Sequence, residues 1–328
     1  MKVRKIHVFY HSSDQDGFMS GFLIKWAIDN DVVKIKRDFK EVVLHKFNIG
    51  FDIPFELIDK DDVVFFTDIS ATPEEMNQVY DNINGKMFWI DHHVSILTDH
   101  EGLVKKVMGL IDVDFSAVQN MHKFILEQGV FTDEQLEIFE GLAPLVEIVG
   151  NQDIYNKDCV DNDMDRWYDE ILSVVYAMNA TNTAPDAPFW EWVMDTPMSE
   201  VIEDLTDEGQ IILSYIKKRN FSLARSYSFP AKFDGLNVLV LNQGIGGSVM
   251  FDGVDTSKYD AVLCYIYNGR RDVYSVSLYR TSHCDINLFE RLKKFGFGGH
   301  AGAGGFRTSL FEIYQKNNTA TIMVPEIN

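Results

Sequence analysis

Cysteine is scarce in this sequence, and its few copies are scattered. Cys159, Cys264 and Cys284 are the three cysteines among 328 residues, and they form no C-x-x-C pair. The spacing therefore indicates neither a disulfide framework nor a zinc site built from thiolates. A reducing cytoplasm is the compartment that this usage favours.

Long apolar segments are also absent. No run approaches the roughly 20 apolar residues that a membrane-spanning helix requires. The N-terminus passes from Lys2, Arg4 and Lys5 into a short strand, without the apolar region and cleavage site of a signal peptide. With 46% hydrophobic and 24% charged residues, the composition is that of a globular protein with real cores. We expect a cytoplasmic protein with no membrane partner.

The sequence also lacks an excess of basic residues. Residues 1–195 contain 16 Lys and Arg against 36 Asp and Glu, and residues 196–328 contain 14 of each sign, so the net charge is −20. Proteins that grip long duplex nucleic acid usually present a basic face, because phosphate neutralisation dominates their affinity. The charge argues against that partner and favours a short anionic substrate held by a few placed groups.

The first half of the chain alternates short apolar runs with helical stretches. This alternation predicts an α/β fold with a doubly wound parallel sheet. Further along, residues 112–150 and 167–179 read as helical. The expected strands are 4–11, 41–47, 62–69 and 86–91, and the helices between them are 17–29 and 73–83.

The second half changes in composition and predicts a smaller α/β domain with a mixed sheet. Strands are expected at 236–241, 260–267 and 273–280, followed by a helix at 285–295. A helix over 199–226 would connect the two domains. The expected division is a catalytic domain at 1–195, a helical connector at 196–228, a substrate-binding domain at 229–316 and a loose tail at 317–328.

Acids and imidazoles follow three of the expected strands of the first domain. The carboxyl ends of parallel strands face one crevice, so these side chains are expected to meet there. Carboxylate oxygen and imidazole nitrogen suit divalent Mn, Mg or Zn, which predicts a hydrolytic metal centre. The residues are His11, Asp14 and Asp16 after the first strand, Asp68 after 62–69, and Asp91, His92 and His93 after 86–91.

Each of these residues also has a structural explanation. His11 could be a hydrogen-bonded histidine at a strand end, and Asp14, Asp16 or Asp68 could cap a helix, since aspartate is a favoured N-cap. The triplet of Asp91, His92 and His93 is harder to explain by packing. All of the structural explanations would have to hold together for the metal centre to be absent.

A glycine-rich stretch lies near the C-terminal end, with Arg280 about one helix upstream. Closely spaced glycines let backbone N–H groups approach a phosphate, and an arginine can engage two of its oxygens. The alternative is a glycine-rich hairpin with an incidental histidine. The expected substrate-binding residues are Arg280, Gly298, Gly299, His300, Gly304 and Gly305.

Taken together, these motifs resemble the DHH phosphoesterase superfamily. The matching segments are His-x-x-Asp-x-Asp-Gly from His11, then Asp68, then Asp91-His92-His93, then Gly-Asn-Gln-Asp-Ile around Asp153. The C-terminal Gly-Gly-His-Ala-Gly-Ala-Gly-Gly is similar to the DHH-associated substrate domain. The resemblance spans residues 4 to about 310 and is closest to the bacterial oligoribonuclease (nanoRNase) and phosphoadenosine-phosphate phosphatase type.

The resemblance implies a site with two divalent cations, commonly Mn²⁺, with Mg²⁺ or Co²⁺ as alternatives. One ion would bind His11, Asp14 and Asp68, and the other would bind Asp16, Asp68, His92 and Asp153. Two ions about 3.5–4 Å apart can activate a water and stabilise charge on phosphate oxygens. His93 would face the scissile phosphate, and Asp91 would orient a neighbouring residue.

Two positions in this pattern need comment. Asp153 lies near other acids that could form a solvated face, such as Asp158 and Asp161, but it alone follows the apolar run 145–149. Phe297 stands where the family often has a glycine, which puts the substrate preference in question and leaves the reaction unchanged. The segment from Asn242 to Gly247 reads as a structural turn, since it opens no phosphate-binding motif.

The function that the resemblance implies is a phosphodiesterase that hydrolyses short oligonucleotides or linear dinucleotides to 5′-mononucleotides. A RecJ-like 5′-exonuclease on single-stranded DNA and a cyclic (di)nucleotide phosphodiesterase are the enzymatic alternatives. A non-catalytic nucleotide sensor is the alternative from a different class. The sequence is compatible with a homodimer, and it does not give the natural substrate, the direction of degradation or the pathway.

Overall fold

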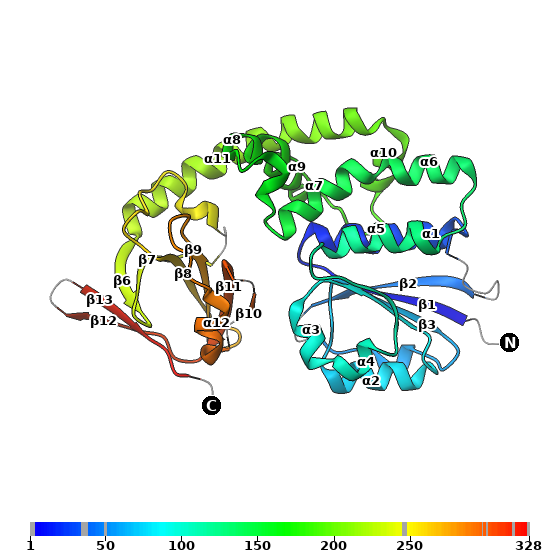
Figure 1. Cartoon of the computed structure of the whole chain (residues 1–328), viewed down its shortest axis with the longest axis horizontal. Helices are drawn as coiled ribbons and strands as arrows, with labels where there is room; N and C mark the ends of the chain where they lie inside the picture. The colour runs from blue at the N-terminus through cyan, green and yellow to red at the C-terminus, as the bar shows by residue number, and fades with distance from the viewer. Residues whose placement is uncertain are drawn as a thin grey trace. The chain divides into compact units, whose positions relative to one another are not determined.

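We describe a computed structural model of the chain, over residues 4–33, 39–48, 51–244, 248–296, 298–299, 301–316 and 319–326. The chain divides into two compact units, Met1–Leu213 and Ser214–Asn328. Each unit has its own sheet and its own core (Figure 1).

The first unit is built on a five-stranded sheet in which every strand pair is parallel. Its spatial order is β2-β1-β3-β4-β5, so the first strand lies inside the sheet and the second lies at its edge. The prediction of a parallel sheet is confirmed. The strands are β1 (Arg4–His11), β2 (Phe39–Phe47), β3 (Val63–Thr67), β4 (Met87–Asp91) and β5 (Met108–Ile111).

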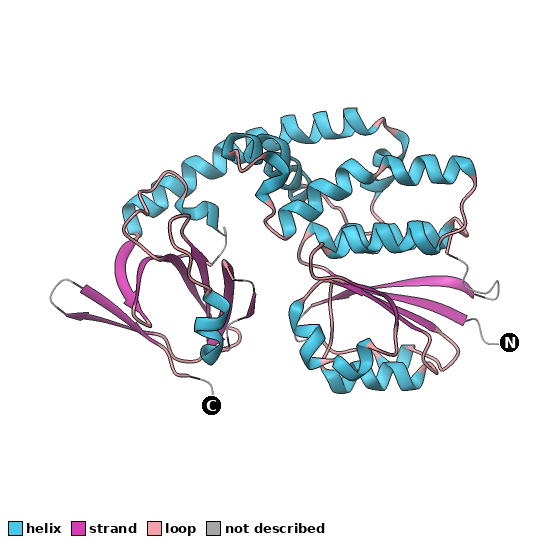
Figure 2. Ribbon diagram, in the orientation of Figure 1, coloured by secondary structure: helices cyan, strands magenta, loops and turns pink. Residues whose placement is uncertain are grey.

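Helices cover both faces of this sheet (Figure 2), as a doubly wound fold requires. Val8 and Phe65 belong to the core on one face, and Phe9, Phe66 and Trp89 belong to the core on the other. Because neighbouring residues on a strand point to opposite faces, a continuous apolar run places apolar side chains on both faces of the sheet. One face carries α1 (Gln15–Asp29) and α5 (Ala117–Gln128), and the other carries α2 (Pro73–Asn82), α3 (Val94–Asp99) and α4 (Glu101–Val104).

A helical segment follows the sheet in the chain, as the sequence predicts. The helix expected over 167–179 is divided, because Trp167–Leu172 forms a π-helical turn before α9 begins. Among the described residues, no helix has both the length and the apolar character needed to cross a bilayer. The helices are α6 (Asp133–Gly141), α7 (Ala143–Asp153), α8 (Met164–Arg166), α9 (Ser173–Ala180), α10 (Pro188–Asp195) and α11 (Met198–Tyr227).

The second unit has a mixed eight-stranded sheet, which confirms the predicted fold class. The order is β10-β11-β9-β8-β7-β6-β13-β12; the β7–β8 and β6–β13 pairs are parallel and the others are antiparallel. A short helix, α12 (Leu288–Leu292), packs its apolar residues into the core. The strands are β6 (Phe229–Phe233), β7 (Leu236–Asn242), β8 (Ala261–Asn268), β9 (Val273–Arg280), β10 (Gly298–Gly299), β11 (Ala303–Thr308), β12 (Glu312–Lys316) and β13 (Thr319–Met323).

The C-terminal segment differs from the expected tail at 317–328. Strand β13 pairs with β12 on one side and with β6 on the other. Ala320 and Ile322 are buried in the core of the second unit. The expectation was wrong for this strand, because its apolar residues alternate with polar ones and fill one face of the sheet.

The unit boundary also falls elsewhere than expected. The two units meet at Leu213, inside α11, whereas the sequence places the end of the first domain at residue 195. Helix α11 is continuous over Met198–Tyr227, as expected for the connector at 196–228. Contacts of its first half with the first unit assign that half to the first unit.

Candidate metal centre

The strand order of the first unit creates a switch point between β1 and β3. In open α/β sheets, ligands bind at such a point, outside the carboxyl ends of the strands. His11 is the last residue of β1, Asp68 follows β3, and Asp91 is the last residue of β4. The three neighbouring strands therefore deliver their polar residues to one edge, as the sequence predicts.

His11, Asp14 and Asp68 form the first group that could hold a cation. His11 Nδ1 lies 2.8 Å from Asp14 Oδ2 and 3.2 Å from Asp68 Oδ2. Asp14 also caps α1, because its Oδ1 accepts a hydrogen bond of 3.1 Å from the backbone N–H of Gly17. Asp14 can therefore cap α1 through Oδ1 and contact His11 through Oδ2 at the same time.

Asp16, His92 and Asp153 form the second group. His92 Nε2 lies 3.4 Å from Asp153 Oδ2 and 3.8 Å from Asp16 Oδ2. Asp153 is the last residue of α7, whose apolar residues fix it over the sheet edge, whereas the other acids of its neighbourhood are outside the group. The structure therefore brings together all six residues that the sequence predicts as metal ligands.

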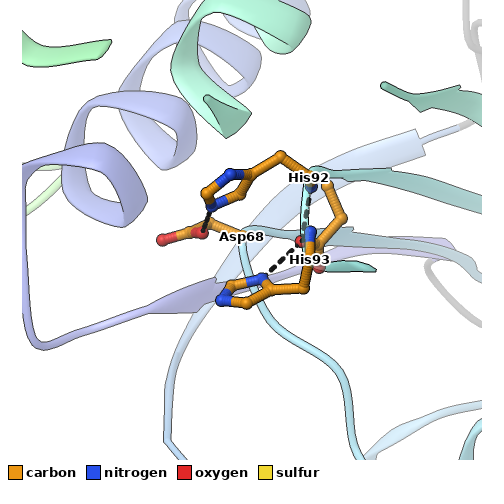
Figure 3. A group of neighbouring side chains, drawn as sticks. Asp68, His92 and His93 are labelled. Carbon is orange, nitrogen blue, oxygen red and sulfur yellow. Dashed lines mark hydrogen bonds and ion pairs between the residues drawn. The ribbon is translucent and has the colours of Figure 1, made fainter. Parts of the chain in front are cut away.

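Asp68 lies between the two groups. Its Oδ2 contacts His11, and its Oδ1 lies 3.4 Å from His92 Nε2, as the dashed line in Figure 3 shows. The backbone of Asp68 has φ 58°, a left-handed conformation that few residues other than glycine adopt and that aspartate tolerates. The turn after β3 thus directs one carboxylate to both groups.

Asp16 is held in place by α5, and the sequence did not reveal this contact. Its two oxygens accept hydrogen bonds from the backbone N–H groups of Ala117 (2.9 Å) and Val118 (2.7 Å), in the first turn of α5. The signal was present in the sequence, because Ser116 and Gln119 have the spacing of a capping box and mark a helix start. Spacing alone did not show which acid faces that start.

Asp91 is fully buried and accepts four hydrogen bonds. Trp89 Nε1 donates to Oδ2 (3.2 Å), and the backbone N–H groups of His92 (2.7 Å) and His93 (3.1 Å) donate to Oδ1. The ring of His93 also donates from Nδ1 to Oδ1 (2.7 Å), since an ionised carboxylate can only accept. Asp91 therefore fixes the orientation of the His93 ring, and its role in the reaction stays a prediction.

The electrostatics of the centre are those of crowded acids. Burial, followed by the charges of nearby aspartates, raises the pKa of Asp68 and of Asp153 well above the ordinary carboxyl value. Burial alone would lower the pKa of His11, but hydrogen bonds with Asp14 and Asp68 raise it to about 11. Without a cation, this crowding of acids favours proton binding by the group. Carboxylate and imidazole donors in this number fit hard divalent cations.

Solved structures of other proteins share this architecture. One of them is described as the DHH domain of a member of the s1p family of ribosomal proteins. The match covers 92% of this chain and 82% of that protein, with a TM-score of 0.55 and 12% sequence identity. The chain has the DHH-domain fold.

Two further structures are similar at lower scores. An exopolyphosphatase-related protein from Bacteroides fragilis covers 95% of this chain and 88% of its own, with a TM-score of 0.49 and 14% identity. The pGpG-specific phosphodiesterase PggH from Vibrio cholerae covers 93% of each chain, with a TM-score of 0.43 and 13% identity. No protein-family model and no curated protein matches the sequence. At these identities, the first likeness shows the DHH-domain fold alone.

In the second unit, the glycine-rich segment forms a hairpin between β10 and β11. Gly298 lies opposite Gly305, and Gly299 lies opposite Gly304. Gly299 has φ +128°, and a Cβ atom on Gly305 would lie 2.5 Å from the carbonyl oxygen of Val276, so both positions exclude larger residues. These glycines have a steric role in the hairpin, which was the alternative that the sequence left open.

Arg280 lies beside this hairpin. Its backbone N–H donates to the carbonyl oxygen of Gly302 (2.7 Å), and its guanidinium lies about 4.0 Å from where a Cβ atom of Gly302 would be. The side chain is exposed, and its Nη1 donates a long hydrogen bond of 3.5 Å to the carbonyl oxygen of Ile286. The structure thus brings Arg280 next to the glycine-rich segment. His300 and Phe297 lie outside the described residues.

Proposed function

We propose that this chain is a metal-dependent phosphodiesterase of the DHH superfamily that hydrolyses short oligonucleotides or linear dinucleotides to 5′-mononucleotides. The observation that carries the proposal is the junction at Asp68, where one carboxylate contacts His11 of the first group and His92 of the second. A carboxylate shared by two groups of oxygen and nitrogen donors is the arrangement that a two-cation site needs.

We assign each ligand group to one cation, with Mn²⁺ as the first choice and Mg²⁺ or Co²⁺ as alternatives. His11, Asp14 and Asp68 would hold one ion, and Asp16, Asp68, His92 and Asp153 would hold the other. When bound, such ions lower the pKa of a coordinated water toward roughly 7 and stabilise negative charge on phosphate oxygens.

His93 is the residue that we assign to the phosphate. Its Nδ1–H is engaged with Asp91, so its Nε2 is the nitrogen left for substrate, and 46% of its side chain is exposed. Burial alone would lower the pKa of His93, but the hydrogen bond and the charge of Asp91 raise it. A charged imidazole can donate a hydrogen bond to a phosphate oxygen, and can transfer a proton to the departing oxygen.

In the second unit, Arg280 is the residue that we assign to the substrate's terminal phosphate. Its guanidinium is exposed, and it presents several donors in a planar arrangement that matches two phosphate oxygens. Gly298, Gly299, Gly304, Gly305 and His300 remain proposed substrate-binding residues beside it.

The decisive experiment is a substrate panel assayed with Mn²⁺. It would contain di- to decanucleotides of RNA and DNA, cyclic dinucleotides, 3′-phosphoadenosine 5′-phosphate and pyrophosphate. We expect the fastest turnover with the shortest linear oligonucleotides, and 5′-mononucleotides as products. Preference for long single-stranded DNA would favour the exonuclease, and binding without turnover would favour a sensor.

Arg280→Ala tests the substrate-binding assignment separately from the chemistry. We expect KM for a 5′-phosphorylated dinucleotide to rise by about tenfold or more, since a charged hydrogen bond contributes about 1.5–3 kcal/mol. The rate at saturation should change little. Arg307→Ala, an exposed arginine on the neighbouring strand β11, is the matched control. An unchanged KM in the Arg280 variant would contradict the assignment.

A further inference from the structure

The strand β12 forms one edge of the eight-stranded sheet of the second unit. It pairs with β13 on its inner side, and no described strand pairs with its outer side. In an antiparallel pair, alternate residues direct their N–H and C=O groups away from the partner strand. The outer side of β12 therefore presents backbone donors and acceptors to another strand.

This edge lacks proline and a β-bulge, which are two of the features that protect edge strands. Its sequence, Glu312-Ile313-Tyr314-Gln315-Lys316, contains no proline or glycine, and its register with β13 is continuous. Ile313 and Tyr314 of this strand are 38% and 50% exposed, which is high for large apolar and aromatic side chains. An exposed edge with these residues is a template for strand addition.

The charges in the sequence of β12 are complementary to the same strand running in the opposite direction. In an antiparallel pair centred on Tyr314, position 312 lies opposite position 316 at both ends, which sets a glutamate against a lysine, and Tyr314 lies opposite Tyr314 of the other copy. Opposite charges and aromatic pairs are the cross-strand combinations that stabilise antiparallel strands. A two-fold axis through Tyr314 produces this arrangement without any other change.

We propose that the outer edge of β12 binds β12 of a second copy of this chain, antiparallel and centred on Tyr314. The two eight-stranded sheets then continue into one another, and the exposed Tyr314 side chains of the two copies are brought together. The proposal is independent of the metal centre and of the reaction. It identifies a homodimer interface in the second unit.

The association is expected to be reversible. A pair of five-residue strands is small compared with the roughly 1,200 Å² that stable interfaces bury, so monomer and dimer should exchange with concentration. Sedimentation equilibrium of the full-length protein should show masses between 37.6 kDa and twice that value, rising with concentration. A chain that stays monomeric at the highest soluble concentration would overturn the proposal.

Charge reversal tests the register. Glu312→Lys places like charges opposite each other at both ends, and Lys316→Glu does the same, so each should weaken dimerisation by about tenfold. The double variant Glu312→Lys/Lys316→Glu restores both opposite-charge pairs and should recover the affinity of the natural chain. Glu290→Lys, an exposed glutamate on α12, is the matched control and should have no effect.

Recovery in the double variant would support the register, since a structural defect in either single variant would not be corrected by the other. Weakening without recovery, or no weakening at all in a chain that dimerises, would overturn the antiparallel pairing. A dimer that forms through another surface would show no weakening in either single variant.

Cysteine substitution gives a test that does not depend on charge. At the two-fold axis, position 314 faces itself, so Tyr314→Cys should form a disulfide between two copies on oxidation. Ile313→Cys is the control, because position 313 faces position 315 and its own copy lies about 7–8 Å away, too far for a disulfide. Peptide mapping separates this bond from any formed by the exposed Cys159. Equal cross-linking of both variants would overturn the register.

Discussion

Asp68 combines an uncommon backbone conformation with contacts to two histidines. Its burial beside other acids raises its pKa, so the ionised form is unfavourable unless a positive charge is near. A carboxyl in such surroundings lowers the stability of the fold and is typical of functional sites. Substitution of Asp68 therefore tests activity and stability together.

Replacing Asp68 by asparagine should have opposite effects on activity and on stability. Turnover should fall by more than about 100-fold, since even residues that only support a metal ligand cost about 10–100-fold. The metal-free variant should melt at a higher temperature than the metal-free natural chain, by about 2–4 °C per kcal/mol gained, because a neutral amide does not carry the cost of a carboxyl whose ionisation is opposed by burial. Dinucleotide assays and calorimetry measure the two effects. Asp165→Asn, in an exposed part of the chain, is the control.

Metal binding at this centre should release protons. The raised pKa values of Asp68, Asp153 and His11 mean that these groups hold protons to a higher pH than usual in the metal-free state, and a group that holds a proton must lose it to bind a cation. The affinity for Mn²⁺ should therefore increase with pH. Titration calorimetry in buffers of different ionisation enthalpy would count the protons. A binding enthalpy that does not depend on the buffer would contradict this account.

At the scale of elements, the N-terminus of α5 is part of the centre. Asp16 joins the start of α1 to the first turn of α5, although about a hundred residues separate them in the sequence. The positive end of a helix dipole favours a carboxylate at this position. The proposed metal ligation and the contact with α5 are thus combined in one side chain.

Asp16→Ala should therefore weaken the fold even without metal. It leaves two backbone N–H groups of α5 without their acceptor, at a cost of about 1–3 kcal/mol each, and relief of the crowded charges offsets part of this. We expect a net loss of about 1–3 kcal/mol in the unfolding free energy. Asp14→Ala is the comparison, since Asp14 accepts a single backbone hydrogen bond and should cost about 0.5–2 kcal/mol. Equal losses in both variants would show that the contacts with α5 contribute little.

Most of the elements that the sequence predicted are continuous apolar runs or amphipathic stretches, whereas β5 and β10 show neither pattern. Strands such as Val63–Thr67 are continuous apolar runs, which only a buried strand or helix produces. Strand β5 is short and half-exposed, and β10 consists of two glycines, so neither has a pattern that sequence reasoning can use. Five of the six candidate ligands were predictable because aspartate and histidine follow strand ends, whereas Asp153 ends α7 and was predicted from the family resemblance and the apolar run before it. The contact between Asp16 and α5 could not be predicted, because the order of segments along the chain does not show which of them lie side by side.

At the scale of the whole molecule, all five tryptophans lie in the first unit and none in the second. Intrinsic fluorescence therefore reports the unfolding of the unit that contains the candidate metal centre. This separation matters, because a protein of two units need not unfold in one step. It allows the pH dependence of the first unit to be measured alone.

The buried histidines of this unit predict how its stability depends on pH. Burial lowers the pKa of His45 to about 4, and also lowers that of His7, whose Nδ1 lies 2.8 Å from His45 Nε2. Because the folded-state pKa is below the unfolded value of about 6.5, the stability contribution is complete above pH 6.5 and is lost as the pH falls toward 4. His45→Gln, which keeps a hydrogen-bonding partner for His7, should reduce this loss by up to about 1.4 kcal/mol per pH unit. Urea unfolding followed by tryptophan fluorescence at several pH values measures it, and a variant with the natural pH profile would contradict the prediction.

The order in which the ligands occur along the chain has a consequence for biosynthesis. His11, Asp14 and Asp68 leave the ribosome early, whereas the second group is incomplete until Asp153 has been made and α7 has folded. A nascent chain that ends before α7 lacks Asp153 and so cannot complete the second group. Under the proposed two-ion scheme, loading with both ions would have to await the folding of α7, and a translation product truncated before α7 would lack a complete centre.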